Sequence, residues 1–309
     1  MKNIRLSLYL HYTMIGLTLS FHAALWLLSF CEARPEGKFL GVFYEKFKES
    51  SKPSYFTPES YPELKSNLYQ GDILLPVTRN AIISNYYKWP WGVIPYTIQP
   101  YFTIEERSKI RKAMDAIESK TCLKFVDKND GKAMQAMNLA HNDYLSITRE
   151  LKKGCYAMIG YQQNFGKPHT MNLESPICLN TQGTIQHELL HVAGLLHEQS
   201  RYDRDNAVVI YWENIDKTYW SDFNKVADNY TTTYGLPYDY TSVMHYPRYA
   251  FSKNGKETIV ARNDPNMALG QRNGATATDL QKVYAMYSCT GVSSMSNSGD
   301  YLGNTFRIF

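Results

Sequence analysis

The 309-residue sequence carries almost no excess charge of either sign. It contains 33 lysine and arginine residues and 29 aspartate and glutamate residues, for a formal net charge of +4. Because a nucleic acid or an anionic membrane surface attracts strongly basic proteins, we expect neither partner. Internal repeats and coiled-coil heptads are also lacking, and low-complexity sequence is confined to the end. With 44% hydrophobic residues, the chain suffices for one sizeable core.

Long apolar runs are absent except near the N-terminus. A short basic start precedes a mostly apolar stretch, residues 6–30, and Ala33 offers a small residue at a cleavage point. This order is typical of a secretory signal peptide. The stretch is also long enough to span a bilayer, so an uncleaved signal anchor is the alternative. His11 and His22 favour cleavage, and we expect a signal peptide over residues 1–33 and a secreted, extracellular protein free of the membrane.

Cysteine is scarce, with five in the whole chain. Cys31 lies at the edge of the predicted signal peptide, which leaves Cys122, Cys155, Cys178 and Cys289. An even set in a secreted chain indicates disulfides, and four cysteines allow three pairings. None of the four stands at the spacing of a metal site, so a zinc–thiolate centre is not expected.

The chemistry is concentrated in the stretch H-E-L-L-H-V-A-G-L-L-H-E, which begins at His187. On a helix, His187 and His191 lie on one face and can reach a single ion. Gly194 permits a positive φ that ends the helix, so that His197 can return as a third ligand. Three imidazoles leave a tetrahedral zinc one open position for water. Glu188 stands close enough to take a proton from that water, which predicts amide hydrolysis.

Two further stretches accompany this motif. The third histidine continues as E-Q-S-R-Y-D-R-D, residues 198–205, and S-V-M-H-Y stands at residues 242–246. The extended H-E-x-x-H-x-x-G-x-x-H pattern with a downstream methionine turn resembles the metzincins. The glutamate after the third histidine, the R-x-D-R-D run and the S-x-M-H-Y turn are similar to the astacin family of metalloendopeptidases. The resemblance covers roughly residues 68–289 and little of residues 1–67.

The resemblance implies an α+β fold, with a two-lobed metzincin-like catalytic domain over residues 80–291 and a short flexible tail over 292–309. A mixed sheet and helices form the N-terminal lobe, the C-terminal lobe is mostly irregular, and zinc lies in the cleft between them. Sequence patterns predict a helix over 103–120 with a capping box of Thr103 and Glu106. Thr184 is the expected N-cap of the zinc helix. Further patterns predict strands over 123–126, 144–148, 155–160, 171–173 and 208–212, and a last helix over 279–287.

The resemblance also implies roles around the metal. Tyr246 matches a tyrosine that is a switchable fifth zinc ligand and then stabilises the oxyanion. Met244 matches a hydrophobic floor beneath the zinc. Arg272 matches an arginine that, in acid-preferring members, pairs with an Asp or Glu side chain of the substrate. The residues alone leave three alternatives open: a buried tyrosine with a satisfied hydroxyl, a core methionine and a surface arginine.

Residues 34–79 are polar and rich in proline, which by itself indicates a weakly ordered arm. Within it, L-Y-Q-G-D-I at residues 68–73 is similar to the Gly-Asp of astacin propeptides, whose aspartate takes the water position on zinc. The resemblance therefore implies that Asp72 keeps the enzyme inactive until a trypsin-like protease cuts after Arg79. The alternative for Asp72 is a Gly-Asp turn before a short strand.

After that cut, the resemblance implies that the new amino terminus at Asn80 is buried and paired with Glu198. The alternative for Glu198 is an exposed carboxylate at a helix end. Asn229 begins an N-Y-T sequon and is an expected glycosylation site in a secreted chain. The resemblance further implies nested disulfides, which join Cys122 to Cys289 and Cys155 to Cys178.

The sequence thus predicts a secreted zinc endopeptidase made as a zymogen, with one zinc per catalytic domain. Glu188 is its general base and then acid, and its substrates are proteins or peptides. The single domain favours a monomer. One alternative is a catalytically silent binding protein on the same scaffold, which would be free to lose Glu188; another is a structural zinc site with Tyr246 as fourth ligand. Pro168 departs from the family pattern, so subsite preferences differ if residues 165–169 support the substrate-binding strand.

Overall fold

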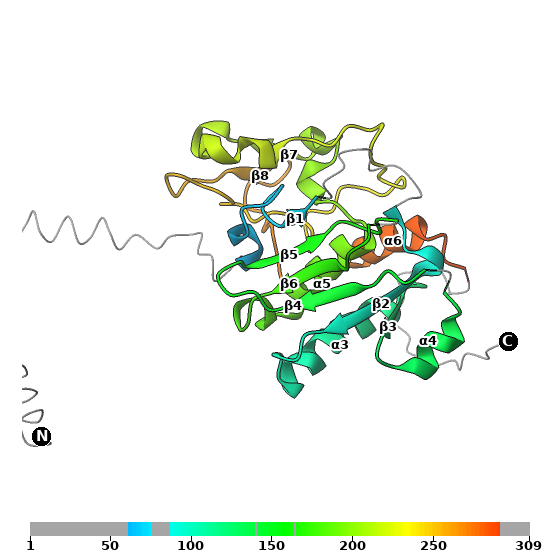
Figure 1. The fold of residues 1–309 in the computed structure, drawn as a ribbon. Helices are drawn as coiled ribbons and strands as arrows, with labels where there is room; N and C mark the ends of the chain where they lie inside the picture. The colour runs from blue at the N-terminus through cyan, green and yellow to red at the C-terminus, as the bar shows by residue number, and fades with distance from the viewer. Residues whose placement is uncertain (1–60, 76–86, 140, 164, 291–309) are drawn as a thin grey trace, which may run out of the picture. The chain divides into compact units, whose positions relative to one another are not determined.

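The computed structural model describes residues 61–75, 87–139, 141–163 and 165–290 (Figure 1). These residues belong to one compact unit that spans Ser54–Phe309. The predicted signal peptide, the bond after Arg79 and the C-terminal tail lie outside the described residues. Within the described ranges, no helix combines the length and the apolar character needed to cross a bilayer.

Helices and strands alternate in the first part of the chain, and short turns dominate the second. The α-helices are α3 (Ile104–Glu118), α4 (Gly131–Met137), α5 (Gln182–Ala193) and α6 (Ala277–Met286). The strands are β1 (Ile73–Leu74), β2 (Val93–Ile98), β3 (Lys124–Asp127), β4 (Leu145–Thr148), β5 (Cys155–Met158), β6 (His169–Leu173), β7 (Val208–Ile210) and β8 (Ile259–Ala261). The 3₁₀ turns are η1 (Pro62–Lys65), η3 (Pro90–Gly92), η4 (Ile177–Leu179), η5 (Glu198–Ser200), η6 (Arg204–Asn206), η7 (Trp212–Asn214) and η8 (Lys217–Phe223).

A six-stranded mixed sheet runs in the order β1-β5-β6-β4-β2-β3. Only the β5–β6 pair is antiparallel within it. The edge strand β1 comes from residues 61–75, here named the 61–75 segment. Ile73 and Leu74 of this strand pair in parallel register with Ala157 and Met158 of β5 (Figure 1). The 61–75 segment is therefore part of the sheet, although the sequence alone indicated a weakly ordered arm. A separate antiparallel pair joins β7 to β8.

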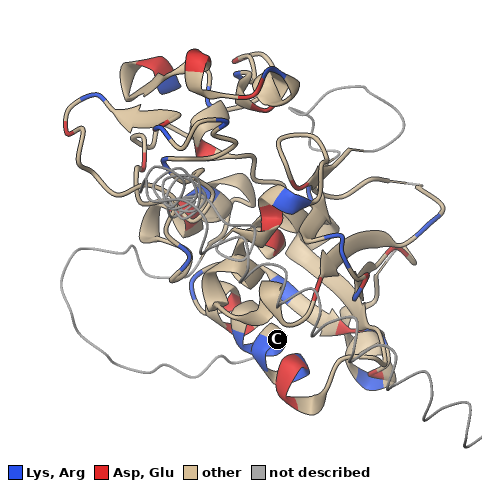
Figure 2. Cartoon of the chain, turned by 90° about the vertical axis from the view of Figure 1, so that its left-hand side faces the viewer, with Lys and Arg blue, Asp and Glu red and all other residues tan. Residues whose placement is uncertain are grey.

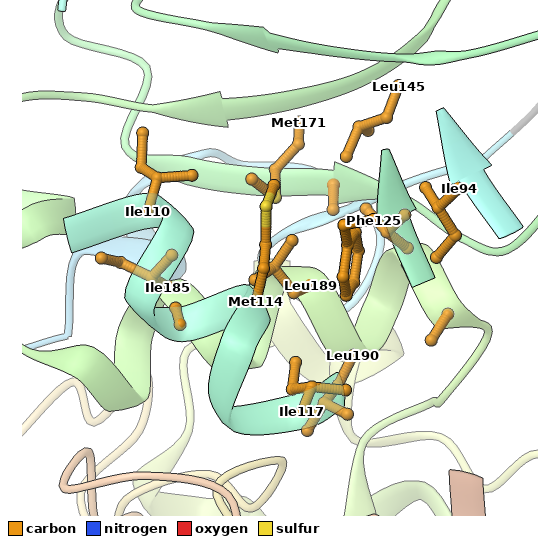
Figure 3. Close-up of a cluster of buried hydrophobic side chains, with 14 of the residues drawn as sticks. Ile94, Ile110, Met114, Ile117, Phe125, Leu145, Met171, Ile185, Leu189 and Leu190 are labelled. Atoms are coloured by element: carbon orange, nitrogen blue, oxygen red, sulfur yellow. The ribbon is translucent and has the colours of Figure 1, made fainter. Parts of the chain in front are cut away.

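Helices α3 and α5 pack together beside the sheet and fill the larger of two hydrophobic clusters. Helix α3 begins at the predicted capping box of Thr103 and Glu106. Its apolar side chains meet those of α5 and of the strands in Figure 3. Each fully buried large apolar side chain contributes roughly 1.5–3 kcal/mol. The residues of this cluster that Figure 3 labels are Ile94, Ile110, Met114, Ile117, Phe125, Leu145, Met171, Ile185, Leu189 and Leu190.

A second cluster lies in the part of the chain that follows α5. It contains Phe223, Tyr246, Phe251 and Ile259, together with Leu64 of the 61–75 segment. The first cluster contains the apolar face of α5 and also Met244. The turn from Met244 to Tyr246 therefore passes from one cluster to the other, as expected for a two-part catalytic domain.

The start of α5 differs from the prediction. Its N-cap is Thr181, whose hydroxyl accepts a hydrogen bond from the Thr184 backbone amide at 3.2 Å, so Thr184 is not the cap. Gly183 follows in the first turn, and because glycine is unfavourable within a helix, it weakened the sequence signal for the helix start. The predicted end is confirmed, because Gly194 adopts φ 110° and its amide bonds back to His191.

Two disulfides form the nested pattern. One joins Cys122 to Cys289 and the other joins Cys155 to Cys178. The first links the chain after α3 to the residues after α6, and the second links β5 to η4. By chain-entropy models, each disulfide contributes roughly 3–5 kcal/mol to stability.

Figure 2 shows Lys and Arg interspersed with Asp and Glu over the described elements.

Candidate metal centre

Three imidazoles converge on one point inside the protein. His187 and His191 project from α5, and His197 returns to them after the turn at Gly194. The Nε2 atoms of His187 and His191 are 3.1 Å apart, and each lies 3.3 Å from Nε2 of His197. All three side chains are buried. The predicted convergence of the three histidines is thus present.

The opposite ring nitrogen of His187 and of His191 has a fixed acceptor. His187 Nδ1 lies 2.7 Å from the Val243 carbonyl, and His191 Nδ1 lies 2.7 Å from the Leu195 carbonyl. Since a carbonyl oxygen can only accept, both Nδ1 atoms carry the proton. Burial lowers the pKa of the His187 ring to about 4, so that ring is neutral. The Nε2 lone pairs therefore face one another, an arrangement that a cation stabilises.

Asp72 supplies a fourth donor from the 61–75 segment. Its Oδ2 lies 2.9 Å from His187 Nε2, and its Oδ1 lies 3.3 Å from His197 Nε2 and 3.5 Å from His191 Nε2. Oδ1 is buried and has no hydrogen-bond partner among the described residues. The segment thus places a carboxylate against the three imidazoles.

The four donors fit a tetrahedral zinc ion. Their ligand atoms all lie within 4.8 Å of one another. A tetrahedron with metal–ligand distances near 2.0–2.1 Å has edges of about 3.3–3.4 Å. The separations given above bracket that value, and three imidazoles with one carboxylate suit zinc.

Glu188 is buried beside this group, as predicted. Neither of its carboxylate oxygens has a hydrogen-bond partner among the described residues. Burial raises the pKa of this carboxyl well above its usual range, and the nearby carboxylates of Asp72 and Glu63 add to the effect. An unpaired carboxyl with a raised pKa beside metal donors is typical of a catalytic acid or base.

Tyr246 is fully buried and its ring lies 4.9 Å from that of His197, centroid to centroid. Its hydroxyl donates a hydrogen bond of 2.5 Å to the backbone carbonyl of Gln70. Burial raises the pKa of this phenol well above 10, so it is a neutral donor. The phenol of Tyr246 thus already binds a peptide carbonyl, one that belongs to the 61–75 segment.

Gln70 also reaches the metal group, which sequence reasoning missed. Its side-chain Oε1 lies 3.1 Å from His197 Nδ1, and its backbone amide donates to Asp222 Oδ1 at 3.1 Å. The third histidine therefore takes its orientation from the 61–75 segment rather than from the core. No sequence signal distinguished this glutamine.

Asp279 fixes the turn that contains Met244, and it too was missed. Its carboxylate accepts hydrogen bonds from the Ser242 hydroxyl at 2.5 Å and from the Val243 amide at 2.9 Å. Asp279 also closes a capping box with Thr276 at the start of α6. The T-x-x-D pattern was the signal that could have found it. Met244 is buried, and its carbonyl accepts the Glu198 amide.

Glu198 is buried in an ion-pair cluster rather than exposed. Its Oε1 accepts from Arg201 Nη1 at 3.1 Å and from the Asp239 amide at 2.9 Å. Its Oε2 pairs with the ammonium of Lys282 on α6. Both oxygens are therefore occupied without the amino terminus that the resemblance implied, and Lys282 is a partner that the sequence did not predict.

Arg272 is also buried, with 7% of its surface exposed, and does not lie on the surface. Its Nε donates to Glu63 Oε1 at 2.7 Å, and its guanidinium lies over the Tyr61 ring at 5.4 Å.

Asn229 is exposed in a turn, where a sequon is accessible.

Comparison with known proteins gives consistent matches. The family model described as Astacin, a peptidase family, matches residues 81–288, which lie inside the predicted catalytic domain. Zinc metalloproteinase nas-4 of Caenorhabditis elegans is 37% identical over 238 residues, 74% of this chain and 71% of that protein. Low choriolytic enzyme of Oryzias latipes is 38% identical over 231 residues, 72% of this chain and 78% of that protein.

A solved structure is similar as well. High choriolytic enzyme 1, a hatching enzyme zinc-protease from the medaka fish Oryzias latipes, is 36% identical to this chain. The match covers 66% of this chain and 94% of that one, with a TM-score of 0.55.

Proposed function

Because the chain belongs to the astacin family of zinc metalloendopeptidases, we propose that it is a secreted zymogen whose zinc site hydrolyses peptide bonds of protein substrates once the 61–75 segment has left. The observation that carries the proposal is the convergence of three imidazoles beside an unpaired, buried Glu188. A catalytically silent binding protein is not favoured, since it would have no need of that carboxyl.

His187, His191 and His197 hold the single zinc ion of the catalytic domain in this proposal. When bound, zinc supplies a Lewis acid that activates water near neutral pH and polarises a carbonyl. Glu188 accepts a proton from the attacking water and then delivers it to the departing amine. It is suited to both steps because no other described residue competes for its oxygens.

Tyr246 is proposed to donate a hydrogen bond to the oxyanion that develops on the scissile carbonyl. Its hydrogen bond to the Gln70 carbonyl supports this role, because that carbonyl is also a peptide oxygen beside the metal group. With Gln70 removed, the phenol is released, and we propose that it becomes the switchable fifth ligand. Met244 supports the site from the first hydrophobic cluster.

Latency is proposed to arise from Asp72, whose carboxylate lies against His187 and His197 and would take the position that the attacking water needs. A trypsin-like protease is proposed to cut after Arg79 and so release the 61–75 segment. The new terminus at Asn80 is then proposed to join Glu198. Since Lys282 and Arg201 already pair with Glu198, the loop after His197 is ordered before the cut.

Arg272 is proposed to bind an acidic side chain of the substrate, because its guanidinium already pairs with a carboxylate of the 61–75 segment. The enzyme is proposed to be a secreted monomer, glycosylated at the exposed Asn229.

The proposal is tested with purified residues 34–309, assayed on casein and on a peptide library before and after limited trypsin treatment. Cleavage is expected only after trypsin, and it is expected to vanish on chelation and in a Glu188→Ala control. A folded, trimmed and zinc-loaded protein that cuts no peptide would overturn the proposal.

A further inference from the structure

Glu63 is a buried acid in the 61–75 segment that lies apart from the metal donors. It belongs to η1 and has no exposed surface. Its Oε1 accepts from Arg272 Nε at 2.7 Å and lies 2.5 Å from Arg272 Nη2. The ring of Tyr61 covers the guanidinium on another side. Glu63 and Arg272 thus form a buried ion pair, and Tyr61 of the same segment also contacts the arginine.

The groups that hold Arg272 adjoin the catalytic residues. Arg272 Nη1 donates to the carbonyl of His245 at 3.3 Å, directly before Tyr246. The backbone carbonyl of Arg272 accepts the amide of Gly183, in the first turn of α5. Arg272 is therefore held between the helix that carries His187 and the turn that carries Tyr246.

Glu63 is the one carboxylate that pairs with Arg272 among the described residues. The remaining partners of the guanidinium are the backbone carbonyls of His245 and Gln271. A buried cation without a counter-charge is unfavourable. Departure of Glu63 therefore leaves an arginine that requires an acidic side chain or water.

Other contacts brace the turn that presents Glu63. Ser66 Oγ donates to the Cys155 carbonyl at 2.8 Å, and Lys65 pairs with Glu174 at 3.2 Å. Leu64 packs in the second hydrophobic cluster. Glu63 Oε2, however, has no hydrogen-bond partner in the described part of the chain. The ion pair uses only one oxygen, so it holds the segment in place without the full strength of a bidentate pair.

We propose that Glu63 acts as a substrate mimic and forms a second inhibitory contact. The 61–75 segment then blocks the enzyme at two separate points, with Asp72 at the water position of the zinc site and Glu63 against Arg272. The inference rests on the proposed peptidase function, and it makes a glutamate side chain the natural partner of Arg272.

The test adds a synthetic peptide of residues 61–75 to the trypsin-cut enzyme and measures inhibition. The Glu63→Gln peptide is expected to inhibit about tenfold or more weakly, because it loses a hydrogen-bonded ion pair. The matched control is a Lys65→Gln peptide, which loses the partly exposed ion pair with Glu174 and is expected to change inhibition less than about threefold.

An enzyme variant separates a specific pair from a general loss of fit. Against Arg272→Gln enzyme, the wild-type and Glu63→Gln peptides are expected to inhibit equally, because the partner is gone. The proposal would be overturned if the two peptides inhibited the unmodified enzyme equally. It would also be overturned if they differed in inhibition of the Arg272→Gln enzyme as much as they do with the unmodified enzyme.

A binding measurement keeps this test independent of turnover. Titration calorimetry of the same peptides into zinc-loaded, trypsin-cut Glu188→Gln protein needs no catalysis and is expected to give the same order of affinities. If the cut enzyme is inactive but the Glu63→Gln peptide still binds more weakly than the wild-type peptide, the proposed peptidase function is wrong and the proposed role of the Glu63–Arg272 pair is supported. If the two peptides bind equally, the proposed role of that pair is wrong, whatever the activity.

Discussion

Each zinc-site histidine takes its orientation from a different segment of the chain. The carbonyl that orients His191 belongs to Leu195, just after the end of α5, and the one that orients His187 belongs to Val243. His197 depends on Gln70 of the 61–75 segment. The first two rings are therefore fixed from outside that segment, and in the proposed activation the third exchanges its partner.

Two buried histidines outside the metal group make stability depend on pH. Burial lowers the pKa of His169 and of His245 to about 4, below the unfolded value near 6.5. Protonation therefore favours the unfolded chain, and stability is lost as pH falls from about 6.5 to 4. Asp222 acts in the opposite direction, because burial raises its pKa to about 6. Glu188, whose pKa is raised, acts with Asp222, whereas His187 and His197, whose pKa values are lowered to about 4, act with the other two histidines. The histidines outnumber the acids, so the midpoint of thermal unfolding is expected to fall over this range.

The control for that prediction is His169→Gln. The amide oxygen of glutamine can accept the Gln162 amide that His169 Nε2 accepts at 2.8 Å, and it does not titrate. Its unfolding midpoint is expected to vary less steeply between pH 6.5 and 4. A wild-type midpoint that is flat or rises toward pH 4 contradicts the account.

Gly183 is predicted to control the position of Arg272. A Cβ at this glycine would lie 2.1 Å from the Arg272 carbonyl oxygen, so the loop has to move. Gly183→Ala is expected to destabilise the protein by roughly 1–3 kcal/mol and to lower any preference of the cut enzyme for acidic peptides. Denaturant unfolding and a cut-site profile measure the two effects.

Gly131→Ala is the matched control. Gly131 also lies in the first turn of a helix, and its added Cβ would have no neighbouring atom within 4 Å. Alanine there is expected to be neutral or stabilising by up to about 1 kcal/mol. Gly183→Ala with the stability and cut-site profile of Gly131→Ala would show that the Arg272 loop does not depend on this close approach.

Helix α6 is tied to the metal loop through Lys282. Lys282→Met would leave Glu198 Oε2 buried without its ammonium partner. Breaking one partner of a buried pair costs roughly 3–5 kcal/mol, and a displaced loop after His197 is expected to lower turnover as well. Denaturant unfolding and peptide turnover check the prediction. The control is Lys120→Met, at an exposed position after α3, which should change the free energy of unfolding by less than about 0.5 kcal/mol. An equally small effect of Lys282→Met would show that Lys282 does not connect α6 to the loop after His197.

Several elements could be predicted because their signals are local. The capping box at Thr103 and the apolar spacing identify α3, and the histidine spacing with Gly194 identifies the end of α5. The cap at Thr181 was missed because the next turn contains a glycine. The two-residue strand β1 has no signal of its own, since its pairing depends on β5.

The candidate site was predictable where one motif carries it, or where the family resemblance brings in a distant residue such as Asp72. It was not predictable where other distant residues meet. His187, Glu188 and His191 stand within one helical turn or next to each other. The contacts of Glu63 with Arg272 and of Lys282 with Glu198 join residues far apart in the sequence. Such pairs arise from the folded chain alone and leave no pattern in a single sequence.

At the scale of the whole molecule, the 61–75 segment is a structural strand and, in the proposed zymogen, also a block. It adds the edge strand β1 to the sheet, places Leu64 in the second hydrophobic cluster and sets Asp72 against the imidazoles. Removal of the segment therefore exposes the site and also takes buried apolar surface from the fold. Activation is expected to lower stability while it creates activity.

The central claim is that one zinc ion sits between the three histidines and that Asp72 completes its coordination in the intact chain. X-ray absorption at the zinc edge, measured with metal content before and after cleavage, tests it most directly. We predict one zinc per chain with four nitrogen or oxygen ligands, and an altered ligand shell only after cleavage. An intact Asp72→Ala chain whose zinc spectrum matches the wild type, or an intact wild-type chain that binds no zinc, would contradict the account.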